Sequence, residues 1–243
     1  VRRSTMSSDL TRSGKFSLGH AVLHFAEMLL GITSLSAGAA MGIIAGLGQT
    51  TSTGTCSALA GTLGIKVGTA MMLLYSFFLL LQLLLLRKEF RLTRLFQLIP
   101  VVLQGWILNF FKYDFPPFQR LDPQSYPQKF LVFAVGMVLI SFGFTCVKCA
   151  KFANYPPESF CTIVAERVGI RFGTSKIVLD FVYVAVTLLL CWRFRLGYEI
   201  VREGTLIFAV CNGTLINLFQ PRVERVFGRL DRLPSAGRES NAF

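Results

Sequence analysis

The sequence predicts an all-α fold, namely a polytopic helical membrane protein with about six transmembrane helices. Hydrophobic residues make up 53% of the 243-residue chain and charged residues only 16%, whereas soluble domains carry about 25% charged residues. Six long segments are almost free of charge. A pattern in the first half also recurs in the second, which predicts two copies of one helical unit.

Each apolar segment is long enough to cross the hydrocarbon core of a bilayer. The first charge-free stretch, 28–65, is too long for one helix, so we expect a helix from near 16 to near 47 and then a separate polar segment. Further spans are expected at 67–86, 95–111, 130–147, 177–192 and 204–221.

The basic residues indicate a topology. The formal net charge is +12, but Lys and Arg occur in short clusters between the apolar segments. This pattern is typical of contact with lipid headgroups and not with nucleic acid. Alternate polar segments hold 18 basic residues on one side and 7 on the other. Both termini are therefore expected in the cytoplasm.

Two sequence motifs recur at nearly constant spacing. L-G-I-K-V-G-T at 63–69 matches V-G-I-R-F-G-T at 168–174, an offset of 105 residues, and G-W-I-L-N-F-F at 105–111 matches G-T-L-I-N-L-F at 213–219. At the first offset Gly31 corresponds to Gly136, and Gly38 to Gly143. We therefore predict two three-helix repeats.

Because three is an odd number, the two repeats are expected to enter the membrane in opposite orientations. The predicted organisation is a cytoplasmic N-terminal tail at 1–15, the first repeat at 16–112, an external loop at 113–128, the second repeat at 129–220 and a basic cytoplasmic tail at 221–243.

Each repeat has a short segment between its first and second spans. Residues 155–169 read as a short helix with proline near its start and glycine after its end. The counterpart at 48–64 is rich in Thr, Ser and Gly. Both are too short to span, so they either re-enter the membrane or lie at its interface. A re-entrant helix would present free N–H groups to an anionic ligand.

The second half resembles a known family. P-P-E-S-F at 156–160, V-G-I-R-F-G-T-S-K-I-V-L-D at 168–180 and R-E-G-T-L-I-F-A-V-C-N-G-T-L-I-N-L-F at 202–219 are similar to the YczE/YyaS/YitT family of bacterial integral membrane proteins. The matching residues are Pro157, Glu158, Lys176, Asp180, Gly204, Thr205 and Gly213. The resemblance implies a protein of the bacterial cytoplasmic membrane without a settled activity.

Two acids are candidates for binding a substrate. Asp180 lies within an apolar segment, one turn after Lys176, and an ionised carboxylate in hydrocarbon costs several kcal/mol unless it is paired or hydrated. It forms either a polar substrate or proton site, or an ion pair with Lys176 near the headgroups. Glu158 is either an acid of the same cavity or a residue favoured by the helix dipole.

The third spans of the two repeats together carry four amide side chains. These amides either link helices by hydrogen bonds or line a pathway. The amides are Gln104, Asn109, Asn212 and Asn217. Together with Glu158, Lys176 and Asp180, they make up the candidate substrate site. We expect structural roles for one proline and four glycines: Pro157, Gly68, Gly173, Gly204 and Gly213.

His20, His24 and Glu27 share one helical face, which suits either an interfacial polar stripe, the interpretation we favour, or a site that relays protons or binds a metal. The sequence shows no catalytic motif and no recognisable metal-ligand spacing, so we expect neither an enzyme nor a bound metal or cofactor. An inverted repeat with polar residues at mid-span favours a transporter of a small solute.

The alternative function is a membrane-embedded binding subunit or assembly factor that acts with a partner protein. The expected partners are the lipid bilayer, an unidentified small-molecule or ion substrate, and further copies of the chain in a homo-oligomer. Nucleic acid is not expected among them.

Overall fold

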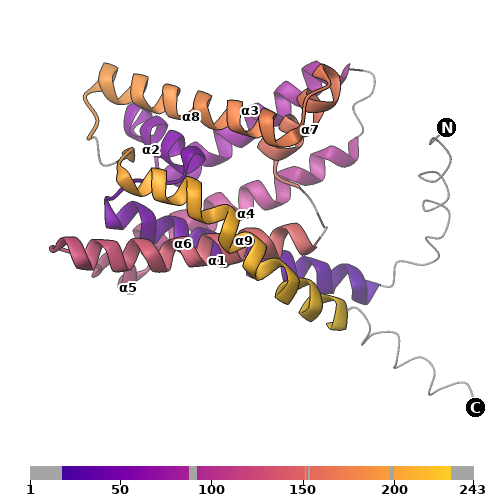
Figure 1. Cartoon of the computed structure of the whole chain (residues 1–243), viewed down its shortest axis with the longest axis horizontal. Helices are drawn as coiled ribbons and strands as arrows, with labels where there is room; N and C mark the ends of the chain where they lie inside the picture. The colour runs from indigo at the N-terminus through magenta and orange to yellow at the C-terminus, as the bar shows by residue number, and fades with distance from the viewer. Residues whose placement is uncertain (1–17, 88–91, 151, 153, 198–199, 231–243) are drawn as a thin grey trace, which may run out of the picture.

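The computed structural model describes residues 18–87, 92–150, 152, 154–197 and 200–230, whose regular elements are all helical (Figure 1). The predicted N-terminal tail lies outside these residues. The elements are α1 (Leu18–Ala45), α2 (Thr51–Leu63), α3 (Val67–Leu86), η2 (Leu92–Gln97), α4 (Leu98–Asn109), η3 (Phe110–Asp114), α5 (Pro116–Gln119), α6 (Tyr126–Ala150), α7 (Pro156–Val168), α8 (Phe172–Phe194) and α9 (Glu203–Leu230).

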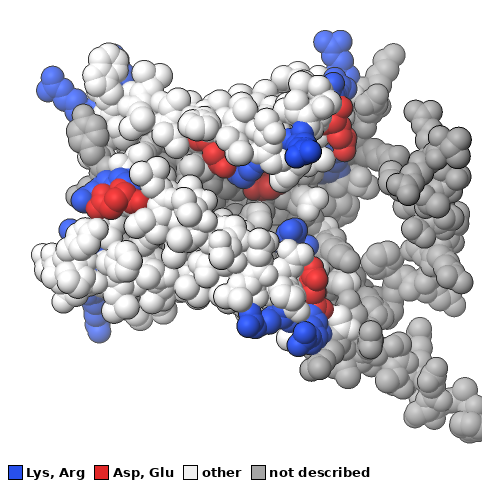
Figure 2. Space-filling view, in the orientation of Figure 1, with Lys and Arg blue, Asp and Glu red and all other residues white. Residues whose placement is uncertain are grey.

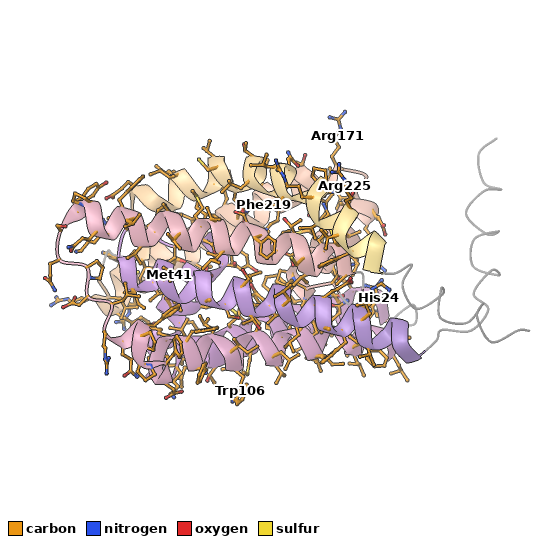
Figure 3. All side chains as sticks on the ribbon, turned by 90° about the horizontal axis from the view of Figure 1, so that it is seen from below. His24, Met41, Trp106, Arg171, Phe219 and Arg225 are labelled. Carbon is orange, nitrogen blue, oxygen red and sulfur yellow. The ribbon has the colours of Figure 1, made fainter. Side chains whose placement is uncertain are left out.

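Five helices are long and apolar enough to cross a membrane, and seen from below the long helices run lengthwise beside one another (Figure 3). They are α1, α3, the run of η2, α4 and η3 at Leu92–Asp114, α6 and α8. The sixth predicted span forms the first part of α9, which is helical but is not among the five. The all-α class predicted from the sequence is confirmed.

Helix α9 contains Pro221 and continues nine residues beyond it, the predicted end of the span, to Leu230. A proline inside a helix removes one backbone hydrogen bond. The helix persists because Val223 and Phe227, one turn apart, are buried against Cys146 of α6. Tertiary packing therefore outweighs the local preference to end the helix.

The antiparallel helices α1 and α6 pack closely against each other. A Cβ atom added to Gly38 would lie 2.5 Å from the carbonyl oxygen of Gly136, and one added to Gly143 would lie 2.5 Å from that of Gly31. Small residues at such positions let two backbones approach closely, which is a common basis of helix association in membranes.

The bounds of the helices recur at an offset of 105 residues. Helix α2 covers 51–63 and α7 covers 156–168, while α3 begins at 67 and α8 at 172. Likewise α4 begins at 98 and α9 at 203, and α1 and α6 end at 45 and 150. The element boundaries thus follow the repeat that the motifs predict, while the inverted arrangement of the repeats stays a prediction.

Both short segments form helices with defined ends. The Thr50 hydroxyl accepts a hydrogen bond from the Thr53 N–H at 3.1 Å and so caps the start of α2. Proline occupies the first two positions of α7, where a missing N–H costs nothing. Gly64 and Gly169 end the two helices with φ of 67° and 75°, a left-handed conformation that glycine adopts without strain.

The two short helices lie beside the long helices of the opposite repeat. Thr51 at the start of α2 meets Asp180, the ninth residue of α8. Tyr155 at the start of α7 meets Tyr75, the ninth residue of α3, with ring centroids 6.0 Å apart. Each short helix therefore begins near the middle of a long one.

The two repeats differ where their last two long helices meet. In the first repeat α3 packs along α4, and a Cβ atom on Gly68 would lie 1.9 Å from the carbonyl oxygen of Gly105. In the second, among the described residues, nothing lies within 4 Å of a Cβ atom placed on Gly173 or Gly213. The first seam is closed, whereas α8 and α9 stand apart.

Candidate functional site

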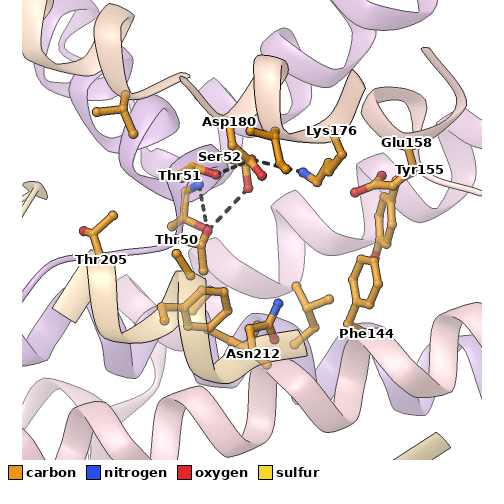
Figure 4. Close-up of a pocket in the computed structure, with 18 of the residues that line it drawn as sticks. Thr50, Thr51, Ser52, Phe144, Tyr155, Glu158, Lys176, Asp180, Thr205 and Asn212 are labelled. Carbon is orange, nitrogen blue, oxygen red and sulfur yellow. Dashed lines mark hydrogen bonds and ion pairs between the residues drawn. The ribbon is translucent and has the colours of Figure 1, made fainter. Parts of the chain in front are cut away.

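A cavity of about 500 Å³ lies between the two repeats (Figure 4). It is lined by residues of α1, α3, α4 and α6 to α9, together with the start of α2. Its wall combines apolar side chains with a group of charged and hydroxyl-bearing ones. The volume lies in the range of about 300–1,000 Å³ that is usual for small-molecule sites.

The face of the molecule shown in Figure 2 is mostly uncharged. The space-filling view shows acidic and basic side chains at the ends of the molecule and in a recess between α8 and α9 (Figure 2). The charged residues that line the cavity are Glu158, Lys176 and Asp180. The side chains of Lys176 and Asp180 are each about one-third exposed, so the cavity opens between α8 and α9.

Asp180 connects α8 with the start of α2. It accepts a hydrogen bond of 2.7 Å from the Thr51 hydroxyl and another of 3.2 Å from the Lys176 ammonium group. Both bonds go to the same carboxylate oxygen, Oδ1. The ion pair that the spacing of Lys176 and Asp180 suggested does form, and it lies at the cavity wall. A substrate or proton role for Asp180 stays a prediction.

The start of α2 contributes four consecutive cavity-lining residues, Thr50 to Thr53. The first amides of a helix have no acceptor within the helix, and here only the Thr53 N–H is bonded to the capping hydroxyl of Thr50. The N–H groups of Thr51 and Ser52 are the remaining donors of the first turn. This end of the cavity is consequently rich in hydrogen-bond donors.

The start of α7 has the opposite character. Pro156 and Pro157 have no N–H, and Glu158 follows them at the third helical position. Burial raises the pKa of the Glu158 carboxyl above its usual value, an effect that Lys176 opposes and Asp180 adds to. Among the residues that the structure describes, the Oε2 atom of Glu158 is buried without a hydrogen-bond partner. A buried acceptor in this state is costly unless a ligand or water satisfies it.

Three further cavity-lining residues carry a buried polar atom without a partner: Gln104 Oε1, the Tyr155 hydroxyl and Thr205 Oγ1. These residues are only 3%, 6% and 7% exposed. Buried polar groups in folded proteins are nearly always hydrogen-bonded. Four unpartnered polar atoms around one cavity, Glu158 Oε2 included, therefore indicate a place for a polar ligand or ordered water.

The four candidate amides separate into two groups. Gln104 and Asn212 line the cavity, and Asn212 also accepts a hydrogen bond of 2.9 Å from Ser141. Asn109 lies at the α3–α4 seam, where its Oδ1 accepts the Gly68 N–H at 2.8 Å. Asn217 is exposed. The structure thus gathers five of the seven predicted substrate-site residues at one cavity and leaves Asn109 and Asn217 outside it.

The residues expected to be structural also differ. Gly204 donates its N–H to the Leu47 carbonyl at 2.8 Å, and a Cβ there would lie 2.5 Å from the same oxygen. Gly68 is equally confined, and Pro157 is buried in the first turn of α7. Gly173 and Gly213 have open space around them.

The polar stripe on α1 lies away from the cavity. Nδ1 of His24 is 3.2 Å from Glu27 Oε2, and neither residue lines the cavity. Figure 3 places His24 toward the end of α1 that leads to the N-terminus. The side chain of His20 lies outside the described part of the chain. The location of His24 agrees with an interfacial stripe better than with a role in the cavity.

Sequence reasoning missed several lining residues. Tyr75 and Tyr155 resemble ordinary core aromatics, and the hydroxyls of 50–53 resemble a small-residue packing surface. The available signal was the repeat itself, because at the offset of 105 residues Tyr75 corresponds to Asp180 and Thr50 to Tyr155. A search for the repeat partners of the candidate acids Asp180 and Glu158 would have found Tyr75 and Thr53.

The fold and cavity define a class: an α-helical protein with five helices apolar enough to span a membrane and a cavity lined by both apolar and polar side chains. The chain belongs to DUF6198, a family of unknown function, which it matches over residues 22–221.

A curated relative supports this placement. The chain is 26% identical over 200 residues to the uncharacterized protein YyaS of Bacillus subtilis (strain 168). The aligned residues cover 82% of this chain and 92% of the relative. The predicted resemblance to YyaS is confirmed, whereas kinship with YczE and YitT stays a prediction. No solved structure matches the chain.

Proposed function

We propose that the chain is a multi-pass protein of the bacterial cytoplasmic membrane that transports a small polar solute by alternating access. The proposal places both termini in the cytoplasm, following the distribution of 18 and 7 basic residues. It assigns the cavity as the substrate site and includes no covalent step. The half-length helices α2 and α7 would re-enter the membrane, each with its N-terminus near the middle.

The contacts between α1 and α6 support an inverted repeat. Gly31 meets Gly143 and Gly38 meets Gly136, and the repeat offset of 105 exchanges these two contacts. Reciprocal contacts of this kind are the signature of a twofold axis. The Ser34 hydroxyl donates a hydrogen bond of 3.0 Å to the Leu139 carbonyl, its own repeat partner. A residue that contacts its own equivalent lies near such an axis.

The observation that carries the proposal is the unequal pair of seams. Gly68, Gly105 and Asn109 close α3 against α4. Their repeat partners Gly173, Gly213 and Asn217 are present in α8 and α9, which stand apart. The second repeat therefore has the small residues and the amide needed to close in the same way.

If the two repeats exchanged these conformations, the cavity would close between α8 and α9 and open between α3 and α4. Transporters with inverted repeats alternate in this manner around a central site. Asp180, Lys176 and Glu158 would bind the solute from either side, because they lie where the two units meet.

Accessibility of the cavity tests the proposal without knowledge of the solute. A single cysteine at Ala209, which lines the cavity, is introduced into a cysteine-free variant and reconstituted in vesicles of known orientation. Reaction with a membrane-impermeant maleimide is measured from each side. We expect reaction from both sides. Reaction from one side only, with and without solutes that stabilise the protein, would contradict alternating access.

A matched control uses a cysteine at Leu189, which lies on α8, is 59% exposed and does not line the cavity. This position faces the hydrocarbon in the proposed arrangement, so a charged maleimide should not reach it from either side. Labelling of this control would indicate that the reagent enters the bilayer.

A second candidate function is a membrane-embedded binding subunit that acts with a partner protein. The open seam favours it, because Lys176 and Asp180 stay about one-third exposed between two apolar helices, and charges facing lipid are costly. A partner helix, or a second copy of the chain, could cover them. Co-purification of a stoichiometric partner from membranes, with loss of solute binding on its removal, would favour this function over transport.

A further inference from the structure

We propose that the ligand is a small zwitterion, whose anionic group binds at the start of α2 and whose cationic group binds at Glu158. This inference rests on the proposed role of the cavity as a solute site, and it names the chemical class of that solute. It follows from the chemical difference between two helix ends that occupy equivalent places in the two repeats.

The start of α2 is suited to an anion. The N–H groups of Thr51 and Ser52 have no acceptor within the helix, and the hydroxyls of Thr50 and Ser52 lie among them. The 13-residue helix adds the positive end of its dipole. Backbone N–H groups at a helix start commonly bind carboxylate or phosphate groups.

A second observation shows that this wall is built to bind something polar. Thr205, 7% exposed, has an unpartnered Oγ1 and lines the same cavity, as does the unpartnered Oε1 of Gln104, which is 3% exposed. Figure 4 shows Thr205 and the residues Thr50 to Ser52 on one side of the cavity.

The start of α7 is suited to a cation. Pro156 and Pro157 remove two of the amides that an anion would use. In their place the cavity has the carboxylate of Glu158, with an unpartnered Oε2, and the unpartnered hydroxyl of Tyr155. Tyr155 is 6% exposed and its ring contacts that of Tyr75. A carboxylate beside aromatic rings is favourable for an ammonium group.

The charges at the cavity wall exclude simpler ligands. Lys176 is already paired with Asp180 at 3.2 Å, and among the described residues Glu158 is the cavity-lining acid that forms no direct ion pair. A plain anion would leave Glu158 without a direct ion-pair partner, because the Lys176 ammonium group is bonded to Asp180, and a plain cation would leave the α2 amides unsatisfied. A zwitterion satisfies both ends, and buried groups left unpaired cost about 1–3 kcal/mol each.

The remaining wall accommodates an apolar side group. Phe144, Phe181 and Phe208 also line the cavity, and about 500 Å³ is ample for an amino acid with an aromatic side chain. Compounds that share one side group but differ in charge therefore provide a direct test.

The experiment compares two matched series: alanine, propionate and ethylamine, and phenylalanine, 3-phenylpropionate and phenethylamine. Binding to the purified full-length chain in detergent is measured by isothermal titration and by the shift in melting temperature, since a ligand of the folded state raises it. We expect at least one zwitterion to bind about tenfold or more tightly than its acid and amine, because each analogue loses one buried charged contact.

The substitution Glu158→Gln should weaken binding of the zwitterion by about tenfold or more and leave binding of the corresponding acid unchanged. Glu166→Gln is the matched control, because Glu166 lies on the same helix, is exposed and does not line the cavity. Equal or tighter binding of an acid or an amine, no binding of either zwitterion, or an unchanged affinity in Glu158→Gln would overturn the inference.

Reconstituted vesicles separate this inference from the proposed function. A zwitterion that binds as expected but is not carried across the vesicle membrane would overturn the transport proposal and leave the ligand class in place. Transport of an acid or an amine in preference to both zwitterions would overturn the ligand class and leave the transport proposal in place.

Discussion

The two repeats share the bounds of their helices but differ in one seam. In the first repeat, Gly68 and Gly105 bring α3 and α4 into backbone contact, and Asn109 bridges them. In the second, the equivalent glycines at 173 and 213 face open space and the cavity reaches the surface. The same residue types therefore occur in a closed and in an open arrangement within one chain.

The difference teaches that these glycines do not by themselves determine whether a seam is closed. A glycine permits close approach, but the gain comes from the contacts that form once the helices meet. In the first repeat those contacts are made. In the second repeat the equivalent residues are present, but the two helices do not meet. The following predictions test this difference, beginning with the largest expected effect.

Alanine at Gly68 should be far more damaging than alanine at Gly173. A Cβ at Gly68 would lie 1.9 Å from the Gly105 carbonyl, so the helices must separate at a cost of about 3 kcal/mol. At Gly173 the space is open, and alanine should be neutral or stabilise the helix by about 0.5–1 kcal/mol. Thermal melting of both variants in the same detergent measures the difference, and equal losses would mean that both seams are closed.

The asparagines should show the same order. Asn109→Ala removes the bonds to the Gly68 N–H at 2.8 Å and to Thr69 Oγ1 at 3.2 Å, so we expect a loss of about 1–2 kcal/mol. Asn217 is exposed, and Asn217→Ala should change the stability by less than about 0.5 kcal/mol. Denaturant titration of the two variants provides the test, and a larger loss at Asn217 would refute the open seam.

Asp180 and its repeat partner Tyr75 differ in chemistry at equivalent places. Asp180→Asn weakens the bonds to Thr51 and Lys176, and because the pair is one-third exposed we expect a loss of only about 1 kcal/mol. In the double variant with Lys176→Met, no unpaired ammonium remains. In a double-mutant cycle, the double variant should therefore lose less stability than the sum of the losses in Asp180→Asn and Lys176→Met. Strictly additive losses would show that the ion pair contributes nothing.

The pH dependence distinguishes the start of α7 from the rest of that helix. Burial raises the pKa of Glu158 above 4.5, with Lys176 opposing and Asp180 adding to the shift. Protonation of Glu158 is therefore more favourable in the folded than in the unfolded state, and stability falls as the pH rises from about 4.5 through the folded pKa.

The Glu158→Gln variant has no carboxyl group that ionises at this position. Its melting temperature relative to wild type should therefore increase with pH in that window. Glu166→Gln should retain the wild-type slope. Parallel melting curves for Glu158→Gln and wild type across this window would argue against a buried acid.

Much of the fold follows from local signals in the sequence. Hydropathy located the long helices, and the repeated motif located α2 and α7 within a few residues, because Gly64 and Gly169 end both helices. Asp180 was found because an acid in an apolar segment is costly, and Glu158 because it is an acid in the first turn of a short helix. Each of these signals lies within a single element.

The parts that sequence reasoning missed depend on contacts between elements. Asn109 and Asn217 are equivalent in sequence, yet one bridges a closed seam and the other is exposed. Tyr155 has no polar signature of its own, and its unpartnered hydroxyl emerges only where α7 meets the cavity. The packing of two helices against each other decides these roles, and no local pattern encodes it.

The distances across the two seams test the central claim most directly. Leu73 and Val102 are exposed on α3 and α4, and their repeat partners Val178 and Val210 are exposed on α8 and α9. Spin labels at each pair, introduced separately into a cysteine-free chain in lipid vesicles, report the two separations by pulsed electron paramagnetic resonance.

Alternating access predicts two distances for each pair, with the short α3–α4 distance populated when the α8–α9 distance is long, and the reverse on exchange. A short α3–α4 distance and a long α8–α9 distance under every condition, with and without a bound solute, would contradict the account.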